Sequence, residues 1–302
     1  MSFARPLYIR RAILKTLIYA SIFDFPLKKE EIWQRLITDK RISFKEICFW
    51  LDRLVKKGVI RKENQYYWPE FLPFPETLSS KKIILEKQRL AQKTANFLKI
   101  FPWIKLVAAT GSLGAENISP NDDIDLLILT QSKRLWLTRL VVQSTLLIFG
   151  RFLGICLRRP NDSLVKDKIC LNLFLTTDSL KIPRESRNLF VAYELMLLKP
   201  LFDKGNFYYA LIAKNKFWLK KYLVNWFKDN RRQDIKGQLE FNDSFFLNIL
   251  EAIAFWIQKK YMSQRKTREK IAKNFAFFHP INKGKRYLRL YKKLLDKSDF
   301  GE

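Results

Sequence analysis

Histidine and cysteine are almost absent from the chain, and this scarcity excludes several kinds of site. The 302 residues include one histidine, His279, and three cysteines, Cys48, Cys156 and Cys170. These numbers exclude a disulfide framework, a zinc site of four thiolates and any metal site that needs two histidines. No serine lies in a nucleophile-elbow pattern that would support a Ser-His-Asp triad. Metal chemistry is therefore expected to use oxygen ligands, and the cysteines, which show no CxxC spacing, are expected to be buried apolar residues.

Glycine, proline and long apolar runs are scarce as well. Nine glycines and eleven prolines do not suit a collagen-like or linker-dominated chain. The longest apolar stretch, Leu140–Gly150, lies between Arg139 and Arg151 and is well short of the about 20 residues that span a bilayer. It predicts a buried helix, while the apolar residues after Arg151 leave a role at a membrane surface open. Residues 1–26 carry no secretory signal, so a cytoplasmic protein without a transmembrane segment is expected.

Apolar and basic side chains are abundant. Apolar residues make up 48% of the chain and aromatic residues 15%, which is enough to fill the core of one large domain or of two to three ordinary ones. The 57 Lys and Arg residues exceed the 29 Asp and Glu residues and give a formal net charge of +28. Such a surplus favours nucleic acid, nucleotides or an anionic membrane face as partners. The alternative is a lysine-rich composition common to the whole proteome, and net charge alone does not decide between the two.

The apolar pattern predicts a winged-helix-like domain over residues 1–75. Ser43 and Glu46 have capping-box spacing at the start of one expected helix, and Gly58 follows its end. Helices are expected over residues 8–21, 28–37 and 43–57, followed by a hairpin over residues 59–68. Three helices followed by a hairpin resemble a winged helix.

The rest of the chain is expected to form a mixed-sheet domain over residues 76–185 and a helical region over residues 186–302, which makes the fold class α+β. Prolines after residue 68 mark the first boundary. Buried-strand patterns are found at residues 105–110, 124–130 and 168–176, and helical patterns at residues 79–98 and 135–157.

The stretch with the clearest chemistry joins two of these strands. Gly111 and Ser112 end the first strand, and Asp123 and Asp125 stand at the head of the second. Residues i and i+2 of a strand project to the same face, so the two carboxylates are expected to form a pair that attracts a cation. Mg²⁺ takes oxygen ligands and commonly bridges carboxylates to substrate phosphates. Gly111 allows close approach of a ligand to the backbone, and Ser112 adds a hydroxyl at an expected helix start.

This arrangement resembles the DNA polymerase β-like nucleotidyltransferase superfamily, whose signature is Gly-Ser followed about ten residues later by Asp-x-Asp between apolar residues. The resemblance implies that Asp123 and Asp125 bind one or two Mg²⁺ ions and that Gly111 and Ser112 hold a nucleoside triphosphate, with ATP as the expected one. It further implies transfer of a nucleoside monophosphate to an acceptor, which the sequence does not identify.

One position departs from the superfamily pattern. Many members carry a third carboxylate on a later strand, and the matching residue here is Asn172, which is expected to contribute to nucleotide binding. An amide offers an oxygen ligand but is no general base at neutral pH. Asp167 and Asp178 flank the strand and replace the missing carboxylate only if the register differs. The alternative function is therefore a catalytically weak or inactive nucleotide-binding winged-helix regulator that binds nucleic acid or a protein partner.

Two basic stretches are candidates for nucleic-acid binding, and for each the alternative is an ordinary solvated face. One lies on the third expected helix and comprises Lys45, Arg53, Lys56 and Lys57. The other lies in the C-terminal region, where aromatic residues are interleaved with Lys259, Lys260, Arg265, Lys266, Arg268, Lys270, Lys273, Lys283, Lys285, Arg286, Arg289, Lys292 and Lys293.

Overall fold

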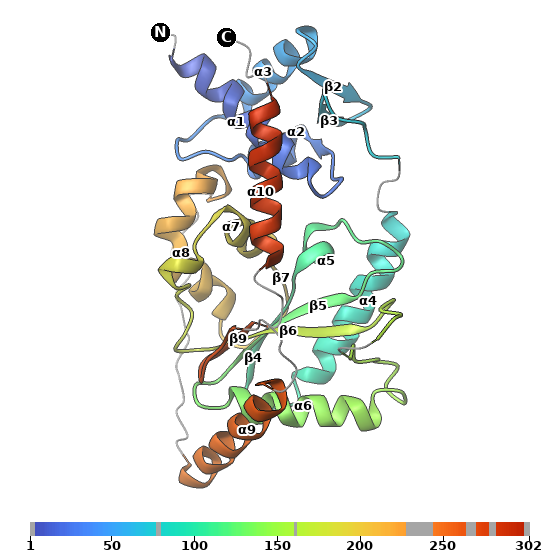
Figure 1. The fold of residues 1–302 in the computed structure, drawn as a ribbon, viewed down its shortest axis with the longest axis vertical. Helices are drawn as coiled ribbons and strands as arrows, with labels where there is room; N and C mark the ends of the chain where they lie inside the picture. Colours follow the sequence, from blue (N-terminus) through green and yellow to red (C-terminus); the bar gives the residue numbers. More distant parts are fainter. Residues whose placement is uncertain are drawn as a thin grey trace.

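The described residues of the chain form a mixed α/β structure with two sheets. The computed structural model describes residues 4–76, 80–159, 162–227, 244–263, 270–277 and 282–298. One sheet has three strands in the order β1-β3-β2, and the other has six in the order β7-β4-β5-β6-β9-β8. Figure 1 shows the small sheet and its helices above the larger sheet, with α6 and α9 at the far end.

The three helices and the hairpin expected near the N-terminus are confirmed. This N-terminal unit contains α1 (Ala4–Ser21), β1 (Leu27–Lys28), α2 (Lys29–Gln34), α3 (Phe44–Lys56), β2 (Ile60–Glu63) and β3 (Tyr66–Pro69). The capping box is present, since the Glu46 side chain accepts from the Ser43 N–H at 2.9 Å and the Ser43 hydroxyl accepts from the Glu46 N–H. Gly58 follows α3 with a φ of +66°, as a left-handed helix end requires. Strand β1 was not expected and pairs with β3.

The strands of the central region are confirmed to within two residues of their expected ends. The elements are α4 (Lys81–Leu98), β4 (Ile104–Ala109), α5 (Gly111–Ala115), β5 (Ile124–Thr130), α6 (Leu135–Phe149) and β6 (Ile169–Thr176). Strand β4 is antiparallel to β5, and β5 is parallel to β6.

The expected continuation of the helix to residue 157 is wrong, because the chain folds back over Gly150. A Cβ at Gly150 would lie 2.2 Å from the Leu146 carbonyl oxygen and 2.4 Å from that of Ile155. The two segments approach each other this closely only where the side chain is absent. None of the helices that the structure describes combines the length and apolarity needed to cross a bilayer.

The expectation that residues 186–302 are helical is wrong in part, because three of their segments complete the large sheet. The elements are α7 (Leu189–Met196), β7 (Lys199–Asp203), α8 (Phe207–Leu223), α9 (Phe245–Ser263), β8 (Lys270–Ile271), β9 (Phe275–Phe277) and α10 (Asn282–Lys297), with short 3-10 turns at Arg184–Ser186 and Val224–Trp226. Strand β7 contains Pro200, which a strand tolerates at a sheet edge, and β7 is the edge strand beside β4.

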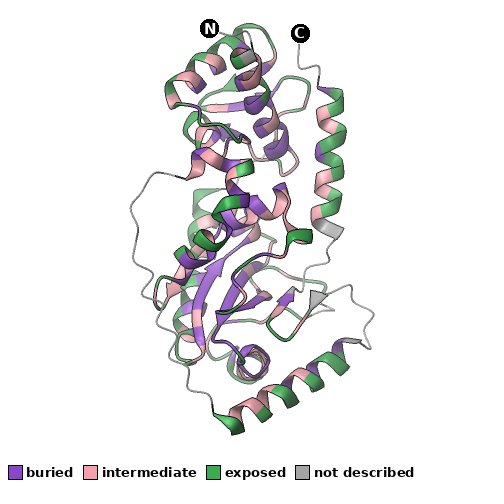
Figure 2. Cartoon of the chain, turned by 90° about the vertical axis from the view of Figure 1, so that its left-hand side faces the viewer, coloured by how far each residue is buried: buried purple, intermediate pink, exposed green. Residues whose placement is uncertain are grey.

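The large sheet separates two apolar cores. Residues on one face, including Ala108 and Leu127, pack with α1, α7, α8 and the rest of the N-terminal unit. Residues on the other face, including Val107 and Ile128, pack with α4, α6 and α9. This alternation follows from the two-residue period of a strand, and Figure 2 shows the buried strands between the two layers. Asp125 has the same strand parity as Leu127 and therefore faces the N-terminal unit.

Candidate functional site

The four residues singled out by sequence spacing meet at one edge of the large sheet. Strand β4 ends where the antiparallel β5 begins, and the Thr110 N–H donates to the Asp125 carbonyl at 3.0 Å. Asp123 immediately precedes β5, and Asp125 is its second residue. The parallel strand β6 begins at the same edge. Gly111, Ser112, Asp123 and Asp125 therefore line one cavity.

Gly111 brings the backbone against one of the two carboxylates. Its φ is +59°, and a Cβ at this position would lie 2.8 Å from Asp125 Oδ2. A side chain would both strain the backbone and displace the carboxylate. Helix α5 begins at Gly111, as expected, and places Ser112 in its first turn.

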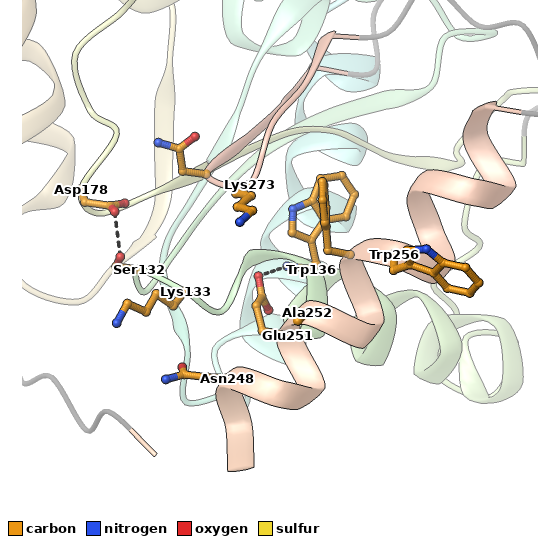
Figure 3. A pocket seen from close by; sticks show the side chains of 11 residues that line it. Ser132, Lys133, Trp136, Asp178, Asn248, Glu251, Ala252, Trp256 and Lys273 are labelled. Carbon is orange, nitrogen blue, oxygen red and sulfur yellow. Dashed lines mark hydrogen bonds between the residues drawn. The ribbon is translucent and has the colours of Figure 1, made fainter. Parts of the chain in front are cut away.

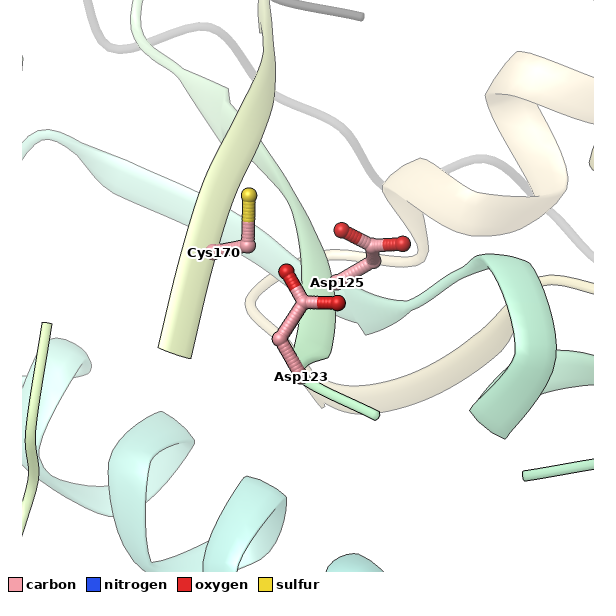
Figure 4. A group of neighbouring side chains, drawn as sticks. All are labelled: Asp123, Asp125 and Cys170. Carbon is pink, nitrogen blue, oxygen red and sulfur yellow. The ribbon is translucent and has the colours of Figure 1, made fainter. Parts of the chain in front are cut away.

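A thiol joins the two carboxylates. Carboxylate oxygens of Asp123 and Asp125 and the sulfur of Cys170 all lie within 4.8 Å of one another. Figure 4 shows the three side chains grouped at the adjoining ends of two strands. Cys170 stands opposite Asp125 in the β5–β6 register and is hydrogen-bonded to it. Burial, and then the negative charges of Asp125 and Asp123, raise the pKa of the Cys170 thiol well above its ordinary value.

The expectation that the cysteines are buried apolar residues is wrong. Cys156 is exposed, and Cys48 and Cys170 are half-buried. Cys170 is the site residue that sequence reasoning missed. It is brought to the aspartates by the parallel pairing of β5 and β6, for which the sequence carries no local signal.

Asn172 lies in β6 at a register shift. Leu171 pairs with Leu126 and Leu173 pairs with Leu127, so Asn172 is the extra residue of a β-bulge. Its side chain lies outside the described part of the structure. The residue that faces Asp125 across the strand pair is Cys170.

Neither flanking aspartate supplies a third carboxylate beside Asp123 and Asp125. Asp167 forms an ion pair with Lys87 at 2.9 Å. Asp178 lies beyond the opposite end of β6, where it accepts from the Ser132 hydroxyl at 2.8 Å. Within the described ranges, the only group of three or more potential metal ligands is the one that Cys170 completes.

A guanidinium lies against the carboxylate pair. Arg158 Nη1 donates to Asp123 Oδ2, and the two side chains form an ion pair. Partial burial lowers the pKa of Arg158, but the hydrogen bond and the charge of Asp123 outweigh it and raise the pKa overall. Arg158 thus places a positive charge where the paired carboxylates attract one.

The loop that carries the aspartates is anchored by a buried lysine. Lys87 is 3% exposed, and its ammonium donates to the carbonyl oxygens of Pro120 and Asp122 at 3.0 and 2.5 Å. Its ion pair with Asp167 balances the charge. The position of Asp123 at the start of β5 therefore depends on helix α4, which carries Lys87.

The cavity over the carboxylates has aromatic walls. It encloses about 420 Å³ between the sheet edge, the turn after α1, α7 and α10. Phe23 and Tyr287 have ring centroids 4.7 Å apart, and Phe190 stacks on Tyr287 at 5.8 Å. Arg35 also lines the cavity. Carboxylates on one side and rings on the other suit a ligand with a charged group and a flat apolar part.

A second, larger cavity of about 720 Å³ lies away from these aspartates (Figure 3). Its lining includes Ser132, Asp178 and Glu251, which bind neighbouring protein groups. Glu251 accepts from the backbone N–H groups of Trp136 and Leu137 at 2.9 and 2.8 Å. Burial raises the pKa of Glu251, although these hydrogen bonds oppose the rise. Because its acidic groups belong to no cluster of potential metal ligands among the described residues, this cavity is the weaker candidate despite its size.

The two basic stretches lie mainly on three helices. Lys45, Arg53 and Lys56 are exposed on α3 and Lys57 directly after it, and Arg53 lies 4.5 Å above the ring of the exposed Phe49. In the C-terminal stretch, Lys259 and Lys260 belong to α9, at the end of the molecule far from α3, whereas five basic residues of the stretch are exposed on α10, which lies beside the N-terminal unit (Figure 1). Arg265, Lys266, Arg268 and His279 lie outside the described residues.

Comparison with known proteins does not place the chain in a family. No protein-family model matches it, and no curated protein matches it either. What the chain does is therefore to be inferred from the side chains at this sheet edge.

Proposed function

We propose that the protein is a Mg²⁺-dependent nucleotidyltransferase that moves a nucleoside monophosphate from a triphosphate, ATP in the simplest case, to a hydroxyl or similar acceptor. The observation that carries the proposal is the Asp123–Asp125 pair at the sheet edge, with Gly111 against Asp125. The same proposal assigns residues 76–185 to a nucleotidyltransferase domain and residues 1–75 to a winged-helix-like domain, and it assigns the protein to the cytoplasm.

The carboxylates fit the ion. Mg²⁺ takes oxygen ligands and binds proteins through one or two carboxylates together with substrate phosphates. When bound, it would neutralise the charge that develops on the transferred phosphoryl group. The chain's own contribution is to hold Asp123 and Asp125 on one face, to bring the Gly111 backbone close to the phosphates and to offer the Ser112 hydroxyl. The aromatic rings over the pair would receive the base or the acceptor.

The test is Mg²⁺-dependent binding and consumption of labelled nucleoside triphosphates in the presence of a cell extract that supplies acceptors. Asp123→Asn and Asp125→Asn are each expected to lower transfer at least about a hundredfold, because metal-assisted charge neutralisation is worth several kcal/mol. Asp178→Asn, at the opposite end of β6, is the matched control and should retain transfer. Transfer that persists in both site variants would contradict the proposal.

The second candidate is a nucleotide-binding regulator without turnover. It is favoured by the thiol that stands where a third carboxylate would complete the site. Metal-dependent nucleotide binding without transfer to any component of the extract is its expected signature. In this candidate, α3 supplies the nucleic-acid contact through Arg53 and its exposed basic neighbours. Salt-dependent duplex binding, lost in Arg53→Ala/Lys56→Ala and kept in Lys214→Ala on α8, tests that contact.

A further inference from the structure

The composition of the ligand group at the sheet edge differs from what Mg²⁺ alone requires. Two of its members are carboxylates from the start of β5, and the third is the thiol of Cys170 on β6. Magnesium takes oxygen ligands, whereas thiolates select ions such as Zn²⁺, Co²⁺ and Cd²⁺. The β5–β6 pairing holds the thiol beside Asp125, and no rearrangement of the fold is needed to bring the three groups together.

We propose that Asp123, Asp125 and Cys170 together form a site for a thiophilic divalent cation, Zn²⁺ above all, which competes there with Mg²⁺. Zinc commonly binds three protein ligands plus water at about 2.0–2.3 Å, which holds the ligand atoms about 3.3–3.8 Å apart. The three ligand atoms lie within 4.8 Å of one another. Binding of the ion therefore requires the distances between them to shorten by only about an ångström. Arg158 shows that the group already attracts a cation.

Cation binding here exchanges one bond for another. The Cys170 sulfur–hydrogen bond breaks, a sulfur–metal bond forms and the proton passes to water. No oxidant or further reactant takes part. The proposal shares its two aspartates with the proposed function, and thiophilic binding would regulate that same site.

The experiment uses Co²⁺ as a spectroscopic substitute for Zn²⁺. A thiolate ligand gives Co²⁺ a charge-transfer absorption in the near ultraviolet, which carboxylates do not give. The full chain is expected to show this absorption at one equivalent of Co²⁺, and Zn²⁺ should displace it. Cys170→Ser is expected to remove the absorption and to weaken Co²⁺ binding by more than about tenfold. Cys48→Ser/Cys156→Ser is the matched control and should keep both.

The outcomes separate this proposal from the proposed function. Absorption that survives in Cys170→Ser, or that disappears in the control variant, overturns the proposal. Because the absorption is read without nucleotide, a chain that binds Co²⁺ through Cys170 but transfers no nucleotide rejects only the proposed function. A wild-type chain that transfers nucleotide but shows no thiolate absorption rejects only the thiophilic site.

A second, independent observation concerns the far end of the molecule, where apolar side chains face solvent. On α9, Trp256 is 62% exposed, and Phe246 and Ile253 are exposed on the same helix. After α6, Phe152 is 92% exposed, and Phe149 is exposed one turn earlier. Surface helices normally present polar residues to water, and large exposed apolar patches mark interaction sites. Figures 1 and 2 place α6 and α9 together at the end opposite the N-terminal unit.

The charges around these apolar residues are positive. Lys260 lies 5.2 Å above the Trp256 ring, and Lys259 lies 5.5 Å above the Phe255 ring. Arg151 is exposed beside Phe152. Glu251, the one acidic residue of α9, is turned inward and bound to the start of α6. Apolar and aromatic side chains bordered by lysine and arginine are the composition of helices that lie in an anionic lipid surface.

We infer that this end of the molecule binds an anionic membrane surface. The chain's net charge of +28 attracts anionic lipid and opposes docking of a second copy of the same chain. The two helices that carry or precede these apolar residues both lie at this end of the molecule.

Vesicle sedimentation tests this inference. The chain is expected to bind vesicles of phosphatidylcholine mixed with phosphatidylglycerol, to bind pure phosphatidylcholine much less and to be released by salt. Phe152→Ser/Trp256→Ser is expected to weaken binding about tenfold or more. Phe217→Ser is the control, since Phe217 is 83% exposed on α8. Equal loss in the control, no preference for anionic lipid, or a dimer in solution that Phe152→Ser/Trp256→Ser disperses would each overturn the inference.

Discussion

Gly111 is the residue at which backbone geometry and the carboxylate pair depend most directly on each other. Its left-handed φ and the 2.8 Å approach of a built Cβ to Asp125 mean that alanine has two costs here. We expect Gly111→Ala to lower the free energy of unfolding by more than the about 1 kcal/mol of backbone strain alone, and to weaken Mg²⁺-dependent nucleotide binding. Urea unfolding and nucleotide titration measure the two effects.

Gly58 supplies the matched control for that substitution. Its φ is +66°, and a Cβ there would meet nothing within 4 Å. Gly58→Ala should therefore show the backbone cost only, with nucleotide binding unchanged. Equal stability losses in the two variants, with binding intact in both, would show that Gly111 does not position Asp125.

Arg158 allows a second prediction at the residue scale. Its guanidinium occupies the position of a cation beside Asp123, so a divalent ion must compete with it. Arg158→Gln is expected to tighten Mn²⁺ binding up to about fivefold, the equivalent of about 1 kcal/mol for a partly exposed ion pair. Electron paramagnetic resonance measures free Mn²⁺, and Arg159→Gln is the control. Unchanged or weaker binding in Arg158→Gln would argue against competition.

The contrast between these residues shows how far the sequence predicts the site. Gly111, Asp123 and Asp125 follow from local spacing, because a strand end, a turn and a strand start lie close together in the chain. Cys170 becomes a neighbour of Asp125 only through the parallel β5–β6 register. Arg158 reaches Asp123 across 35 residues from a segment with no regular pattern. Contacts set by tertiary register leave no local signal.

At the scale of elements, the site depends on helix α4. Removing the Lys87 ammonium would take its charged donor away from the carbonyl groups of Pro120 and Asp122. We expect Lys87→Met to lower the free energy of unfolding by about 2 kcal/mol, since hydrogen bonds from a charged group contribute about 1.5–3 kcal/mol. Mn²⁺ affinity should fall as well, because the loop before β5 loses its anchor.

Lys82, exposed on the same helix, is the control for that prediction. Lys82→Met should change stability by no more than about 0.5 kcal/mol. If Lys87→Met loses stability but keeps full Mn²⁺ affinity, then Asp123 is positioned by β5 alone and α4 has only a structural role.

The elements differ in how well their sequence patterns predict them. The Ser43–Glu46 capping box and the β5 strand can each be predicted from their own residues, and both are found where expected. Strand β7 cannot be predicted in this way, because Pro200 interrupts its apolar pattern and its hydrogen-bond partner is β4, which lies far away in the chain. Strands β8 and β9 are too short for a periodic pattern and are likewise defined by the sheet that they join.

At the scale of the whole molecule, three tyrosines join distant parts of the chain. Tyr19 of α1 lies between Tyr193 of α7 and Tyr291 of α10, with ring centroids 4.3 and 5.4 Å away. All three are buried. The Tyr193 hydroxyl donates to the Arg35 carbonyl at 2.6 Å. This cluster holds the C-terminal helix against the N-terminal unit, and the aromatic wall of the cavity over the carboxylates depends on that contact.

The cluster makes the fold sensitive to alkali. Burial raises the pKa of Tyr19, Tyr193 and Tyr291 above the ordinary value of about 10. Above that pH the unfolded chain releases these protons while the folded chain keeps them, so stability falls as pH rises toward the folded-state pKa values. Below about pH 10 both states are protonated and the stability contribution is complete.

Tyr291→Phe tests whether the buried tyrosines cause this loss of stability at alkaline pH. Among the described residues, the Tyr291 hydroxyl has no hydrogen-bond partner, so phenylalanine keeps the ring packing and removes a buried polar group that binds nothing. We expect unchanged or up to about 1 kcal/mol higher stability at neutral pH and a shallower decline above about pH 10, measured by urea unfolding across that range. Tyr209→Phe, at an exposed position on α8, should leave the decline as steep as in the wild type. A wild-type slope in Tyr291→Phe would mean that the alkaline transition arises elsewhere, and α10 would then be held to the N-terminal unit independently of this ionisation.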